Sequence, residues 1–92
     1  MSAAANSFRL RVYTPEHELI NTQVREVTAE GAYGQIGVLP DHAALVTVLE
    51  PGVLTYSALD GGTVRLRLGG GFAEVHDNVM TVLADSGEPL AA

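Results

Sequence analysis

Apolar and polar residues alternate over short stretches along most of this chain. Near the start, Phe8, Leu10 and Val12 alternate with Arg9, Arg11 and Tyr13, and further along Val64, Leu66 and Leu68 alternate with Arg65 and Arg67. A period of two residues is typical of a β-strand with one buried face. We therefore expect residues 64, 66 and 68 to point inward. The two arginines between them should point to solvent, because a slip by one residue would bury their charges.

Turn signals separate the expected strands. We place strands at residues 8–13, 24–29, 36–39, 45–49, 53–59, 63–68, 72–76 and 79–83. Asp41 could instead cap a helix, but Val46, Thr47 and Val48 are β-branched and favour a strand there. No segment has a sustained helical period. Short strands with turn signals every 8–12 residues or so predict an all-β sandwich or barrel.

Composition narrows the class of protein. The 92 residues fit one domain, and a hydrophobic content of 47% is typical of a folded one. The sequence has no cysteine, which excludes disulfides and zinc–thiolate sites within it. The net charge of −6 argues against nucleic-acid binding, which needs a cationic surface, and the five arginines form no run. No apolar stretch approaches the roughly 20 residues of a membrane helix, and MSAAANS does not resemble a secretory signal.

Few residues suggest chemistry. The histidines, His17, His42 and His76, lack the spacing of a metal site, and we expect the His42 ring to bond within its own loop. Residues 69–71 are glycines, but no lysine or helix follows as a phosphate loop requires, so a bulge or a close backbone approach is the better interpretation. The trio Asp41, His42 and Thr47 matches no catalytic motif. We predict no catalytic residue, metal or cofactor.

Three sequence blocks together resemble one family. They are FRLRVYTPEHEL (residues 8–19), YGQIGVLPDHAALVTVLEPG (residues 33–52) and LGGGFAEVHDNVMTVLAD (residues 68–85). Their order and spacing are similar to those of the epsilon subunit of the rotary F-type ATP synthase, called delta in mitochondria. The resemblance implies a sandwich of about ten short strands in two sheets. Ala44, where the family often has proline, and Glu50 before the Pro-Gly turn are small departures.

The resemblance also implies a mechanical role. Family members sit in the central stalk, bind the gamma subunit and rest on the c-ring of the membrane sector, without catalysing a reaction. By similarity, Tyr33, Gly34 and Gln35 face the c-ring, and Thr14, His42 and Thr47 face gamma; a partly buried Tyr33 ring is the alternative. The implied location is the cytoplasmic face of the bacterial inner membrane, with membrane association only through the complex. A stand-alone β-sandwich adaptor for another protein, or a small enzyme, is the alternative function.

The expected organisation is a flexible N-terminus at residues 1–7, the sandwich at 8–85 and a short tail at 86–92. Family members continue into two C-terminal helices that inhibit ATP hydrolysis and in some members bind ATP. Here the resemblance stops at SGEPLAA, where Gly87 and Pro89 disfavour a helix. We expect a naturally short chain that lacks the inhibitory arm.

Overall fold

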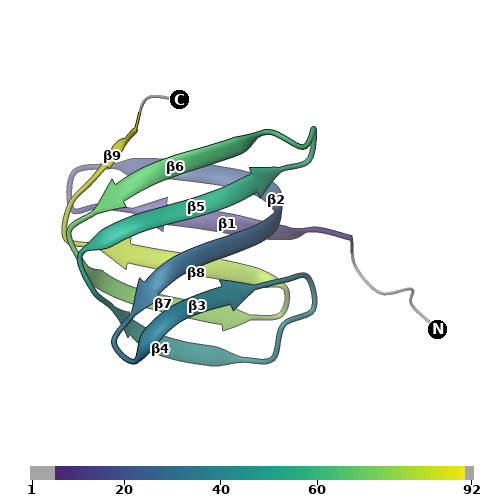
Figure 1. Ribbon diagram of the computed structural model, residues 1–92, viewed down its shortest axis with the longest axis horizontal. Coiled ribbons are helices and arrows are strands. Elements are labelled where there is room, and N and C mark those ends of the chain that lie inside the picture. Colours follow the sequence, from purple (N-terminus) through teal and green to yellow (C-terminus); the bar gives the residue numbers. More distant parts are fainter. Residues whose placement is uncertain (1–5, 91–92) are drawn as a thin grey trace.

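The computed structural model describes residues 6–90 as an all-β structure (Figure 1). Nine strands lie within this range: β1 (Phe8–Tyr13), β2 (Glu18–Gly31), β3 (Gly34–Val38), β4 (Leu45–Leu49), β5 (Gly52–Ala58), β6 (Thr63–Leu68), β7 (Gly71–His76), β8 (Val79–Ala84) and β9 (Gly87–Pro89). The all-β prediction is confirmed, and the count is close to the ten strands expected. The expected flexible N-terminus lies largely outside the described residues.

Two layers of strands face each other, and β2 belongs to both (Figure 1). Residues 18–24 of β2 pair with β1, which pairs with β8; β7 and β4 complete this layer. Residues 24–31 of β2 pair with β3 and β5, and β6 and β9 follow. The register shifts between Val24 and Glu26, as at a β-bulge, where the strand passes from one layer to the other.

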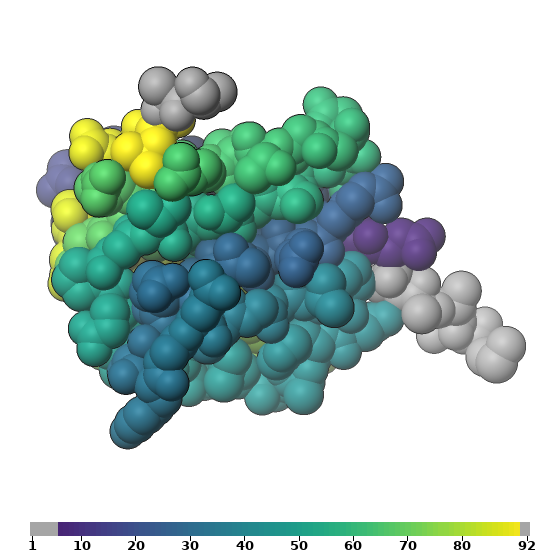
Figure 2. All heavy atoms as spheres, viewed as in Figure 1, coloured from purple at the N-terminus to yellow at the C-terminus, as the bar shows by residue number. Residues whose placement is uncertain are grey.

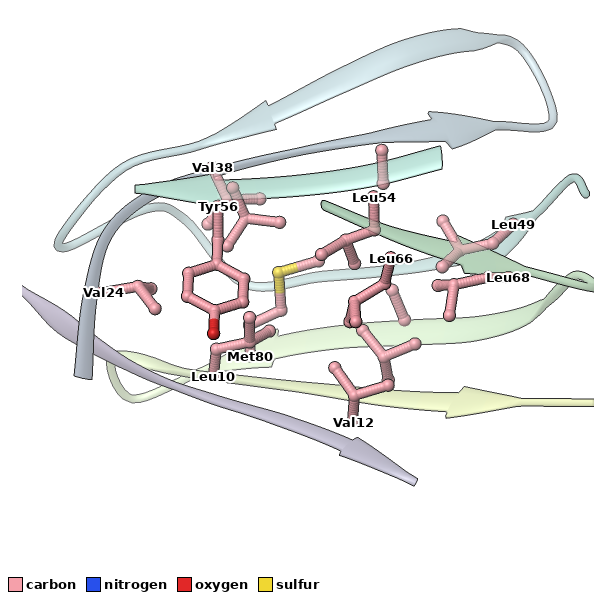
Figure 3. Packing of buried hydrophobic residues seen from close by; sticks show 14 of the residues in the cluster. Leu10, Val12, Val24, Val38, Leu49, Leu54, Tyr56, Leu66, Leu68 and Met80 are labelled. Carbon is pink, nitrogen blue, oxygen red and sulfur yellow. The ribbon is translucent and has the colours of Figure 1, made fainter. Parts of the chain in front are cut away.

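Aliphatic side chains from both layers fill the space between them. In Figure 3, Leu10, Val12 and Met80 of one layer face Leu54, Tyr56 and Leu66 of the other. No charged residue is buried among residues 6–90. Burial raises the pKa of the Tyr56 phenol, because the charged phenolate would be poorly solvated there.

The alternation in β6 has the predicted orientation. Leu66 and Leu68 are buried and Val64 packs against the core, whereas Arg65 and Arg67 are exposed. The boundaries of β4 and β6 also match the prediction. Because the pleat places alternate residues on opposite faces, one clear run of alternation was enough to set the orientation of this strand.

Two elements differ from the expectation. β2 begins at Glu18 and not near Val24, because its polar first half pairs with β1 through the backbone while Leu19 and Ile20 pack on the core. Within the expected tail after Asp85, Gly87–Pro89 forms β9 and pairs with β6. Pro89 is compatible with this position because β9 is an edge strand and the Leu90 N–H donates to the Arg65 carbonyl, so the next pair, Pro89 and Leu66, is a non-hydrogen-bonded pair that needs no N–H from Pro89.

The connections between strands gather at two opposite ends of the sandwich. Figure 1 shows the β1–β2, β2–β3 and β4–β5 connections at the left end and the β3–β4, β5–β6 and β7–β8 connections at the right end. At the left end, the Glu50 N–H donates to the Glu30 carbonyl over 2.8 Å. At the right end, the Asp41 N–H donates to Oδ1 of Asn78 over 2.8 Å. These bonds tie neighbouring connections together.

Candidate interaction surfaces

The β2–β3 turn carries the most exposed large hydrophobic side chain of the described residues. Tyr33 has 103% of its reference exposure, so the alternative of a partly buried ring is wrong. Gly34 follows with φ +122°, a conformation that L side chains rarely adopt, and it lets the chain reverse sharply into β3. Figure 2 shows this turn projecting at the lower left of the molecule. The turn therefore offers an aromatic ring to a neighbouring surface.

Gln35 lies beside Tyr33 on the same hairpin. Its backbone pairs with Glu30, and its Nε2 donates to Oε2 of Glu30 over 3.4 Å. Gln35 and Glu30 are both exposed. The structure therefore brings together the three residues predicted to face the c-ring, Tyr33, Gly34 and Gln35, on one projecting turn.

The three residues predicted to face gamma do not form one cluster. Thr14 lies in the β1–β2 turn at the left end, where its N–H donates to the His17 carbonyl over 2.9 Å. His42 lies in the β3–β4 loop at the right end. The length of β8, six residues at about 3.3 Å each, separates the two ends by roughly 17–20 Å.

His42 bonds within its own loop, as the sequence predicted. Its Nδ1 lies 2.7 Å from the Ala43 carbonyl oxygen, which can only accept, so Nδ1 carries a proton. The His42 N–H also donates to the Leu39 carbonyl over 3.2 Å. These bonds hold the loop next to Asp41, whose φ is +61°.

Thr47 lies in β4 on the same face as the buried Leu49 and is half-buried. Its hydroxyl donates to the Val48 carbonyl over 3.3 Å. The side chains that β4 turns outward are those of Val46 and Val48, with 72% and 47% exposure. A partner that contacts this strand would therefore first meet the two valines.

These valines belong to an apolar surface that the sequence analysis missed. The ladder places Val48 opposite Phe72 and Phe72 opposite Leu83, in a row across β4, β7 and β8. Phe72 and Leu83 are 58% and 56% exposed. We call the exposed set Val46, Val48, Phe72 and Leu83 the outer apolar face. Thr14 borders it, because Thr14, Phe72 and Leu83 line one depression.

The signal for this face was present in the sequence. LVTVL in β4 is apolar on both faces, a pattern that predicts cover on both sides of a strand. Phe72 and Leu83 likewise alternate with the buried Ala73 and Val82. Single exposed apolar residues are ordinary on a protein surface, but a contiguous group marks an interaction site.

The described residues hold little that suggests chemistry. Within residues 6–90 no group of three or more His, Asp or Glu side chains is placed to hold a metal ion. The His76 ring lies beside the carboxylate of its neighbour Asp77, with 3.2 Å between Nδ1 and Oδ2. Gly71 packs directly against the backbone of Leu83, which is the close approach expected for the glycine run. The same residues contain no helix that is long and apolar enough to span a bilayer.

Comparison with known proteins identifies the family. Residues 7–90 match the family described as the ATP synthase delta/epsilon chain, beta-sandwich domain. The chain belongs to this family. The sandwich of two five-stranded layers and the outer apolar face are therefore features of an epsilon-family domain.

Curated relatives of this epsilon-family domain are ATP synthase epsilon chains. The chain is 41% identical over 85 residues to that of Desulfitobacterium hafniense, covering 92% of this chain and 64% of the relative. It is 44% identical over 84 residues to that of Carboxydothermus hydrogenoformans, covering 91% of this chain and 62% of the relative. The chain thus spans less than two thirds of the length of these relatives.

A solved structure has the same fold. A chain of the Euglena gracilis mitochondrial ATP synthase, in a cryo-EM structure of OSCP, F1 and c-ring, superimposes with a TM-score of 0.88 at 26% identity. The match covers 96% of this epsilon-family domain and 56% of that chain. A chain from the central stalk and c-ring of the Tetrahymena thermophila enzyme has a TM-score of 0.74 at 22% identity, covering 87% and 64%, and supports the fold alone.

Proposed function

We propose that this domain is a rotor part of an F-type ATP synthase. In this role it joins the gamma subunit to the c-ring, so that ion-driven rotation of the ring is coupled to ATP synthesis. It catalyses no reaction itself. Its place is the cytoplasmic face of the bacterial inner membrane, which it reaches only through the complex. Membership of the epsilon family supports this proposal, as does the likeness to a chain of a complex that contains F1 and c-ring.

The outer apolar face is the observation that carries the gamma contact. Four large apolar side chains stay exposed on three adjacent strands, which favours a surface that another protein covers. Thr14 borders this face, whereas Thr47 is next to Val46 and Val48 in β4 but turns its side chain to the opposite face of the strand. His42 would meet gamma only if the contact extends along the strands to the right end. Energy in such contacts concentrates in a few buried anchors, and Phe72 is the largest candidate.

The c-ring contact is supported by the β2–β3 turn. An exposed tyrosine is suited to such a contact because its ring is apolar and its hydroxyl can form hydrogen bonds. Short backbone bonds between Ala32 and Val48 and between Glu50 and Glu30 fix the base of the hairpin. A turn whose base is held by backbone hydrogen bonds can contact the c-ring without changing its conformation.

Binding to purified gamma tests the first contact. The double variant Val46→Asp/Phe72→Asp places two charges on the outer apolar face and should weaken binding at least about tenfold, because charged residues are depleted from interface centres. Leu59→Asp is the control, since Leu59 is 47% exposed in the β5–β6 hairpin away from this face. If the parent chain fails to bind gamma at all, an adaptor for another protein becomes the better interpretation.

Coupling measurements test the second contact. Gln35→Lys changes the charge of the projecting turn next to Glu30, and we expect weaker proton-driven ATP synthesis by the assembled enzyme with an unchanged melting temperature of the domain. Thr63→Lys adds the same charge at the exposed start of β6, at the other end of the sandwich, and should couple like the parent. Normal coupling by the Gln35 variant would contradict the assignment of this turn to the c-ring.

A further inference from the structure

Two arginines extend the outer apolar face along β1. Tyr13 lies next to Leu83 in the ladder, which continues the apolar row from β8 onto β1. Arg11 and Arg9 follow on the same outward face of β1, since Leu10 and Val12 point into the core. The Arg11 guanidinium carbon lies 5.3 Å from the centroid of the Tyr13 ring, a cation–π distance that keeps this charge at the border of the apolar row.

The residues directly opposite the two arginines on the adjacent strands are uncharged. Arg9 pairs with Gln23 on one side and Val79 on the other. Arg11 pairs with Asn21 and Thr81 in the same way. Within residues 6–90, no carboxylate lies within ion-pair distance of either guanidinium.

The guanidinium of Arg9 is already positioned. Its Nη1 donates to Oδ1 of Asn21 over 3.2 Å. Because the Asn21 amide is uncharged, this bond orients the guanidinium without neutralising its positive charge. Arg9, Arg11, Asn21 and Val79 line a shallow depression with a volume of about 370 Å³. The acids close to Arg11 in the ladder are Glu18, which pairs with Tyr13 on the neighbouring strand, and Glu74, which lies two strands away from Arg11 across Thr81. At about 4.8 Å per strand this separation is near 10 Å, comparable with the screening length in physiological salt.

The chain has a net charge of −6, which by itself favours solubility. Solubility therefore does not explain why two arginines without an ion pair lie beside an apolar face. Of the other arginines, Arg25 donates from Nε and Nη2 to the Leu59 carbonyl, and Arg67 has Glu88 as its cross-strand neighbour. Arg65 also has a neutral cross-strand neighbour, Thr55, but it lies on β6, away from the outer apolar face. We propose that Arg9 and Arg11 bind carboxylates on the same partner surface that covers the outer apolar face. This inference rests on the proposed function, because that partner is then the gamma subunit.

The arrangement assigns separate roles to the two halves of the surface. The apolar half supplies burial, which is non-directional. The arginine half sets orientation, because a guanidinium binds a carboxylate through two parallel N–H groups. Charges at the rim of an interface act mainly on the association rate and its salt dependence. The partner would thus carry an apolar patch with acidic side chains along the edge that meets β1.

A salt-dependent binding experiment tests the inference. The 92-residue chain and its variants are titrated against purified gamma at low and at physiological ionic strength. Arg9→Gln/Arg11→Gln should weaken binding at least about tenfold at low salt, mainly through slower association, and should flatten the salt dependence. Arg65→Gln/Arg67→Gln is the matched control, with the same residue type, spacing and change of net charge on an exposed face of β6 in the other layer. This control should bind like the parent.

The outcomes separate this inference from the proposed function. If Val46→Asp/Phe72→Asp abolishes binding while Arg9→Gln/Arg11→Gln binds gamma like the parent at both salt concentrations, the role of the arginines is refuted and the gamma contact stands. If both arginine pairs weaken binding equally, the effect is one of total charge and the inference is also refuted. If gamma binds neither the parent nor any variant, the proposed function itself fails.

Discussion

Replacing Gly71 by alanine should destabilise the domain strongly. Gly71 begins β7 with φ +142°, where an L residue is strained by about 1–3 kcal/mol. A Cβ at this position would overlap the Leu83 carbonyl oxygen and lie 2.9 Å from the Ala84 Cα. Because backbone atoms of β8 would have to shift, overpacking adds about 1–3 kcal/mol. Together the cost is about 2–6 kcal/mol, a large part of the roughly 5–14 kcal/mol expected for a domain of this size.

Urea unfolding followed by circular dichroism measures this cost, since a shift of the midpoint at constant slope reports a change in stability. Gly37→Ala is the matched control, because Gly37 also lies in a strand but has no atom within 4 Å of an added Cβ. The control should change the free energy of unfolding by less than about 1 kcal/mol. A Gly71 variant as stable as the Gly37 variant would refute the argument from close backbone approach.

Three further predictions concern the core, pH and regulation. Leu66→Ala should lower the free energy of unfolding by about 2–5 kcal/mol, whereas Arg65→Ala should stay within about 0.5 kcal/mol; equal losses in urea titrations would contradict the assigned orientation. Because burial raises the pKa of Tyr56, the Tyr56 phenol loses its proton at a lower pH in the unfolded state than in the folded state. The free energy of unfolding should therefore fall as pH rises above about 10. Tyr56→Phe should remove this pH dependence, and the control Tyr33→Phe should not. The 92-residue chain, whose described residues contain no helix, should leave ATP hydrolysis by an epsilon-free F1 unchanged; inhibition relieved by deleting residues 86–92 would contradict this.

Local patterns predicted most of this fold, and they failed where pairing is decided by distant segments. The alternation in β6 and the β-branched run in β4 determined both strands directly. The first half of β2 was missed because ELINTQ has no clear period, and its strand form depends on pairing with β1. β9 has only three residues, and only its register with β6 defines it. Backbone hydrogen bonds of this kind leave little trace in side-chain pattern.

The candidate site was predicted in part, for a related reason. The glycine at position 34 indicated an exposed turn, and the structure places Tyr33 on it. The outer apolar face required knowledge of which strands are neighbours, because its residues come from β4, β7 and β8. That Arg9 and Arg11 have uncharged residues directly opposite them likewise follows only from the register with β2 and β8. Sequence spacing alone showed two arginines on one strand and nothing about what lies beside them.

The positions of the two surfaces allow two partners to bind at once. The outer apolar face lies on the strands of one layer, and the β2–β3 turn projects from one end of the sandwich. No residue belongs to both. A force on the β2–β3 turn would act on β2, the 14-residue strand shared by both layers. β2 pairs with β1 and β4, which belong to the layer that carries the outer apolar face. Since protein cores are close-packed and the core formed by residues 6–90 contains no buried charge, it can transmit such a force with little local deformation. A two-layer sandwich with a shared strand therefore suits the proposed role of a rigid link between the c-ring and gamma.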